Sequence, residues 1–140
     1  MTHWIPTLTL ALALASNAAF ADDALPGAPA DPRIAEAGAL LDSKAEWPRA
    51  IALYEAVLAD APKNLQARLW AARVHAWHGD YDASLAHFAA LLALPEPPAG
   101  IEVEHAEVLS WSGRSDAAVA AFVQILEREP ANARALRGLA

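Results

Sequence analysis

Two stretches of the chain decide its fold. Residues 65–98 read LQARLWAARVHAWHGDYDASLAHFAALLALPEPP, and residues 99–132 read AGIEVEHAEVLSWSGRSDAAVAAFVQILEREPAN. The same residue types return every 34 positions, and the register extends back over residues 31–64. The matching sets are Ala50, Ser84 and Ala118; Tyr54, Phe88 and Phe122; Val57, Leu91 and Ile125; Leu58, Leu92 and Leu126; and Gly38, Ala72 and Ala106. The chain is therefore a repeat of one structural unit.

Each unit carries the pattern of two helices joined by a turn. Apolar residues recur at helical spacing before Gly79 and again after it. Gly79 and Gly113 are expected to take positive φ where the chain reverses, and Asp80 and Ser115 to cap the second helices. One such hairpin cannot bury its apolar face alone, so stacking of about three units is needed for stability.

The small-x-x-apolar, Ala-x-x-x-aromatic and terminal-Pro pattern of these units resembles the tetratricopeptide repeat, a helix–turn–helix unit of 34 residues. The resemblance implies an all-α, right-handed superhelical stack of about three hairpins, an α-solenoid. Its units would be residues 31–64, 65–98 and 99–132, with residues 133–140 starting a fourth unit or forming a short cap. Leu136 and Leu139 make a poor polar cap, so either this short helix packs as a meagre cap or the sequence is the front part of a longer protein, which we favour. An uncapped last hairpin also predicts end-to-end association.

The N-terminal residues differ in character from the rest. Ile5 to Ala15 is mostly apolar, and Ala19-Phe20-Ala21 offers the small residues that a signal peptidase needs. We interpret residues 1–21 as a secretory signal peptide and residues 22–30 as a Pro/Ala/Asp-rich leader, although the start lacks Lys and Arg. A short apolar helix packed on the domain is the alternative. Secretion would make the mature protein periplasmic.

Composition excludes several classes of protein. Among 140 residues there is no Cys, which rules out disulfides and thiolate metal sites. The formal net charge of −7, without a basic cluster, argues against a nucleic-acid partner. No stretch of the mature chain is apolar enough to span a membrane. No catalytic arrangement of side chains is evident, so we expect neither an enzyme nor a cofactor.

The resemblance also implies where a ligand would bind, because the first helices of such units line the concave groove. The candidate groove residues are Gln66, Leu69, Trp70, Arg73, Trp77, Glu104, Glu107, Ser110 and Trp111. Arg73 and Glu107 could bind a ligand or pair with each other.

Trp77 and Trp111 lie 34 residues apart and should share one wall of the groove. Either each ring packs between neighbouring hairpins, or the two form a ladder of flat faces for a sugar chain or an extended peptide. Packing is the more common role of buried Trp.

The histidines raise the question of metal binding. His75 and His78 have metal-ligand spacing on a helix, and His105 could approach them. His75 and His105 nevertheless fall at packing positions, so they are interpreted as core residues, with His87 on the convex face. The sequence predicts no metal site.

Two functions remain open. The first is a periplasmic scaffold that holds a protein or peptide partner in its groove. The second follows from the phrase Ala-Arg-Val-x-x-Trp-x-Gly-x-Tyr at residues 72–81, which resembles the repeats preceding the barrels of YaiO-like and exopolysaccharide-export outer-membrane proteins. That resemblance implies a partner in polysaccharide export or in its assembly machinery.

Overall fold

The computed structural model describes residues 30–140. The predicted signal peptide, residues 1–21, and the leader up to residue 29 lie outside the described residues.

Hairpins of α-helices make up the described chain, which contains no strand. The helices are α2 (Pro32–Ala39), α3 (Trp47–Asp60), α4 (Leu65–His78), α5 (Tyr81–Leu92), α6 (Ile101–Trp111), α7 (Ser115–Arg128) and α8 (Ala133–Leu139), with a 3₁₀ turn, η1 (Lys44–Glu46), before α3. Three hairpins, α2/α3, α4/α5 and α6/α7, are followed by the single helix α8. The predicted all-α fold of stacked hairpins is confirmed.

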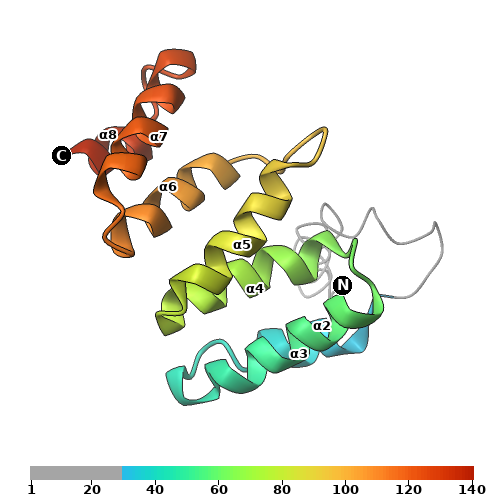
Figure 1. Cartoon of the computed structure of the whole chain (residues 1–140). Coiled ribbons are helices and arrows are strands. Elements are labelled where there is room, and N and C mark those ends of the chain that lie inside the picture. The colour runs from blue at the N-terminus through green and yellow to red at the C-terminus, as the bar shows by residue number, and fades with distance from the viewer. Residues whose placement is uncertain (1–29) are drawn as a thin grey trace, which may run out of the picture.

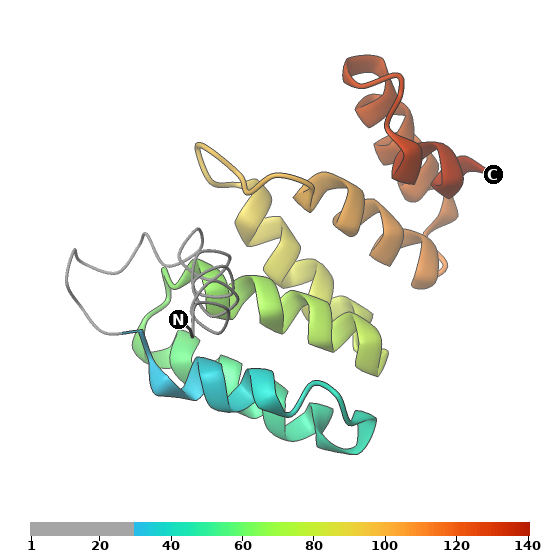
Figure 2. The same ribbon diagram turned by 180° about the vertical axis from the view of Figure 1, so that it is seen from behind.

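The hairpins follow one another along the molecule (Figures 1 and 2), from α2 and α3 at one end to α7 and α8 at the other. Each helix packs mainly on the helices before and after it in the chain, and α6 also contacts α8. This nearest-neighbour packing is the hallmark of a solenoid.

Glycines end two of the first helices as predicted. Gly79 has φ 94° and Gly113 has φ 80°, a backbone conformation that side chains with a Cβ rarely adopt. The predicted second-helix caps are only partly right. Asp80 holds the N-cap position of α5 without a side-chain capping bond, and Ser115 is the first residue of α7 rather than its cap.

Side-chain caps lie instead at the starts of α2, α4 and α8, whereas α6 begins after Gly100 without one. The Asn64 Oδ1 atom accepts a hydrogen bond from the Ala67 backbone N–H (2.9 Å), and Asn132 repeats this with Ala135 (3.0 Å). Asp31 caps α2 through the Arg33 N–H (3.0 Å). Each bond satisfies one of the amide groups that a helix start leaves without a partner.

The first hairpin departs from the other two. Helix α2 ends at Ala39, and a turn with η1 precedes α3. Pro48 sits in the first turn of α3, where its missing N–H costs nothing. The indole N–H of Trp47 donates to the Leu41 carbonyl (2.9 Å), which fastens this longer connection to the start of α3.

Most of the residues that repeat in sequence lie in the core. Tyr54, Phe88 and Phe122 are each 1% exposed, and each belongs to the apolar cluster of its own hairpin. At the α4/α5 interface the Ser84 hydroxyl donates to the Ala72 carbonyl (2.7 Å), so this polar member of an otherwise Ala set is satisfied. Among the described helices, none is both long and apolar enough to cross a membrane.

Candidate functional site

A hollow of about 270 Å³ opens on the side of the stack formed by the first helices of successive units. Its walls come mainly from α4, α6 and α8. They are Arg73, Ala76, Trp77, Phe88, Glu104, Glu107, Val108, Trp111 and Arg134, and we call this site the groove pocket. Its volume lies just below the usual range for small-molecule sites, so it suits one or two side chains of a partner.

Both repeat tryptophans line the groove pocket and keep large exposed fractions, 44% for Trp77 and 53% for Trp111. Trp77 also packs on other indoles: its ring centroid lies 5.9 Å from that of Trp47 and 6.3 Å from that of Trp70. Trp77 thus packs on other rings while remaining partly exposed, whereas Trp111 exposes more of its surface to solvent. Neither side chain is buried between neighbouring hairpins.

Two ion pairs cross the wall of the groove pocket. Arg73 donates to both oxygens of Glu104, at 2.8 and 2.7 Å, and Arg134 donates to both oxygens of Glu107, at 3.1 and 2.5 Å. The suggested Arg73–Glu107 pair is therefore not formed. Hydrogen bonding to Glu107 raises the pKa of Arg134, with burial opposing. Such bidentate ion pairs hold both side chains in fixed positions.

Not every predicted groove residue reaches this surface. Gln66 is 8% exposed and Leu69 only 2%, so the prediction that these two face a ligand is wrong. Leu69 instead belongs to the buried apolar cluster that also contains Phe88 and Leu91 of α5. Trp70 is half-buried against the first hairpin, and Ser110 is exposed but does not line the groove pocket.

Sequence reasoning missed one charged member of the groove pocket. Arg134 occupies the second place of the partial fourth unit, the same place as Gln66 in its own unit. The 34-residue register therefore contained the signal that could have found it. Phe88 and Val108 were also missed, because both are core residues that show only an edge to the hollow.

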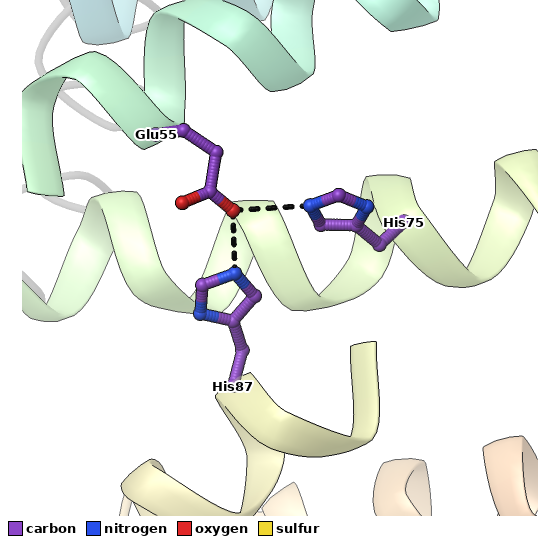
Figure 3. A group of neighbouring side chains, drawn as sticks. All are labelled: Glu55, His75 and His87. Carbon is purple, nitrogen blue, oxygen red and sulfur yellow. Dashed lines mark hydrogen bonds and ion pairs between the residues drawn. The ribbon is translucent and has the colours of Figure 1, made fainter. Parts of the chain in front are cut away.

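The histidines lie elsewhere. His75 and His87 both direct a ring Nε2 atom at the same oxygen of Glu55, at 3.0 and 2.6 Å (Figure 3), and their rings stack with centroids 5.6 Å apart. His78 is exposed and outside this group, and His105 packs edge-on against Phe88. His87, which the sequence placed on the convex face, has a side chain that is only 13% exposed.

Burial shapes the protonation of these groups. Burial alone would raise the pKa of Glu55. The hydrogen bonds from His75 and His87 have the larger combined effect, so the pKa of Glu55 lies below its ordinary value. Burial lowers the pKa of His87 despite the opposing Glu55 carboxylate, and burial alone lowers that of His105. The lowered pKa values favour the neutral imidazole at pH 7 for His87 and His105.

The fold defines a class: an α-solenoid of helical hairpins, here with a hollow on the side formed by its first helices. Residues 44–96, which span η1 and helices α3 to α5, match the family model of the tetratricopeptide repeat. No curated protein matches the chain, and no solved structure does. Repeats of this kind generally mediate protein–protein interactions, and the family is a scaffold rather than an enzyme.

Proposed function

We propose that the protein is a scaffold that holds an exposed segment of a partner protein in the groove pocket. The observation that supports this most is the pair of half-exposed indoles, Trp77 and Trp111, over one hollow. Exposed aromatic surface beside fixed charges is typical of binding hot spots.

The charges around the hollow define what the partner segment carries. Arg73, Arg134, Glu104 and Glu107 balance one another, and each is already bonded. A strongly charged ligand would have to break these pairs, whereas an aromatic or branched apolar side chain would only cover the indoles. The favoured partner is thus a peptide segment with one such anchor and modest net charge.

A library of displayed random peptides, selected against the full chain, tests this function. Selected peptides should share an aromatic or branched apolar anchor, and Trp111→Ala should weaken them by tenfold or more, about 1.4 kcal/mol. Gln124→Ala is the matched control, since Gln124 is exposed on α7 and outside the groove pocket. Peptides that bind both variants equally, or no enrichment at all, would refute the proposal.

A glycan partner is the second candidate, and the same indoles favour it, because flat aromatic faces stack on sugar rings. It would make the protein a guiding or assembly component of polysaccharide export. Titration with soluble β-linked oligosaccharides should then shift the tryptophan fluorescence of the wild type but not of Trp77→Ala. An unchanged fluorescence spectrum at millimolar sugar would contradict the glycan partner and favour the peptide partner.

The periplasm is the proposed location, on the strength of the apolar run and the Ala19-Phe20-Ala21 motif. Expression in a Gram-negative bacterium should give a periplasmic product whose N-terminus is Asp22. Recovery of an uncut chain in the cytoplasm would contradict this.

End-to-end self-association is proposed from the apolar end of the stack, where Val119, Val123, Leu136 and Leu139 are each 39% to 50% exposed. Sedimentation should reveal dimers that Leu136→Glu abolishes. A monomer at high concentration would contradict the proposal.

A further inference from the structure

Three metal-binding side chains from three consecutive helices meet on the opposite side of α4 from the groove pocket. Glu55 comes from α3, His75 from α4 and His87 from α5, and one ligand atom of each lies within 4.8 Å of the others. On a helix, His75 points about half a turn away from Arg73 and Trp77, so the cluster shares no wall with the groove pocket. Figure 3 shows both rings turned toward one carboxylate oxygen.

We propose that Glu55, His75 and His87 bind a divalent transition metal ion, with zinc the best match. Two neutral imidazoles and a carboxylate are ligands that zinc favours, and three protein ligands leave a fourth position for water. Two ligands come from the second hairpin and one from the first. The ion would therefore join two units of the stack.

The spacing of the ligand atoms requires only a small adjustment. Donor atoms around a tetrahedral zinc lie about 3.3 Å apart, given bond lengths of about 2.0 Å. The Glu55 oxygen now lies 3.0 Å from His75 Nε2 and 2.6 Å from His87 Nε2. The Glu55 side chain is 42% exposed and can move outward, while the two histidines, 11% and 13% exposed, are held by packing.

The far nitrogen of His75 is a second, independent sign of a metal. His75 Nδ1 is buried, and within the described part of the chain it has no hydrogen-bond partner. Asp80 Oδ2 stands 3.5 Å from it. When His75 Nε2 donates a hydrogen bond to Glu55, the unprotonated Nδ1 atom of His75 directs its lone pair toward the Asp80 carboxylate, which is unfavourable. A metal on Nε2 moves the proton to Nδ1 and gives Asp80 a donor, the usual carboxylate–histidine–metal arrangement.

One contact opposes the ion. An Arg68 guanidinium nitrogen lies 3.3 Å from His87 Nδ1 and donates to it, and the same side chain also donates to the Pro62 carbonyl (2.7 Å). Metal on Nε2 would place a proton on Nδ1 facing Arg68, so Arg68 must swing aside. Arg68 therefore weakens the site, and a side chain that accepts a hydrogen bond there should strengthen it.

The test is titration of the metal-free full chain with zinc chloride in a non-chelating buffer near pH 7, followed by calorimetry. The wild type should bind one zinc ion per chain. His87→Gln and Glu55→Gln should each weaken binding by tenfold or more. Arg68→Gln should tighten binding, because the glutamine amide oxygen can accept a hydrogen bond from His87 Nδ1–H. His78→Gln is the matched control, an exposed histidine on α4 that should change nothing.

Two further readouts separate coordination from a loss of folding. Cobalt(II) should give a visible absorption band that His87→Gln removes, and zinc should raise the thermal midpoint of the wild type but not of His87→Gln. Circular dichroism identifies any variant that has unfolded. The proposal is overturned if no saturable zinc binding occurs below about 1 mM, or if His78→Gln abolishes binding while His87→Gln does not.

Discussion

Tyr54, Phe88 and Phe122 show how a single residue position serves the fold in each unit. All three are 1% exposed and lie on second helices opposite small residues of the first helices. Tyr54 differs in carrying a hydroxyl, and a Cβ placed on Gly38 would come within 4.0 Å of it. Burial raises the pKa of Tyr54 to about 12, from an ordinary value of 10.0.

This shift predicts how stability depends on alkaline pH. Between about pH 10 and pH 12 the unfolded chain releases the Tyr54 proton while the folded chain keeps it, so the free energy of unfolding falls, by up to about 1.4 kcal/mol per pH unit. Below that range the contribution is fully present. Urea unfolding at about pH 9 and about pH 11.5 measures it.

Tyr54→Phe supplies the comparison, because it removes the Tyr54 hydroxyl and leaves every other side chain in place. The stability advantage of the wild type over Tyr54→Phe should shrink as the pH rises. Parallel losses in the two proteins would show that the Tyr54 hydroxyl titrates normally.

At the scale of elements, asparagine caps fix where first helices begin. Asn64 and Asn132 stand two residues after Pro62 and Pro130, and both caps bond the amide three residues on. The proline stops the preceding chain from continuing as a helix, and the cap then starts the next one. Helices α5 and α7 lack side-chain caps and depend more on packing.

Removing the Asn64 cap should cost about 1 kcal/mol, in the range of about 0.5–2 kcal/mol known for such sites. Asn64→Ala therefore lowers the free energy of unfolding measured in urea. Asn64→Asp keeps the acceptor oxygen and adds a charge favourable to the helix N-terminus, so it should retain full stability. Equal losses in both variants would mean that the capping bond contributes nothing.

Over the described part of the molecule, stability comes from interfaces between neighbouring helices, and the interface between α7 and α8 contains one very close approach. Gly138 on α8 lies against the Phe122 ring, where an added Cβ would sit 2.3 Å from the nearest ring carbon. Phe122 is buried, so its ring cannot turn out to solvent. Only the absence of a side chain lets α8 dock on α7.

Gly138→Ala should therefore destabilise the docking of α8 by about 1–3 kcal/mol, against a gain of about 1 kcal/mol in helix propensity. Hydrogen exchange should show faster exchange in α8 with little change in α4. Phe122→Leu makes room for the added methyl group, so Gly138→Ala should cost less in that background. A double-mutant cycle with no coupling would contradict the close contact.

Docking of α8 also matters for the groove pocket, because Arg134 holds Glu107 from this helix. Peptides selected on the wild type should therefore bind Gly138→Ala more weakly, even though residue 138 does not line the pocket. Unchanged affinity would show that α8 is dispensable for binding.

The sequence by itself determined the repeat, the hairpins and the aromatic core, because these depend on local periodicity and on positions that recur every 34 residues. Gly79 and Gly113 could be assigned to turns since only their backbone freedom matters there. The same register placed Trp77 and Trp111 on one wall, but it left open whether their rings pack or are exposed, and the structure shows both exposed.

Only the tertiary structure decided which side chains meet between units. Arg73 pairs with Glu104 rather than with Glu107, and Leu69 is buried in the core. Both outcomes depend on the angle between neighbouring helices, because this angle determines which facing residues come into contact. Glu55, His75 and His87 come from three different helices, so no metal-ligand motif of short sequence spacing indicates that they meet. Contacts of this kind depend on how hairpins stack, which chain periodicity does not encode.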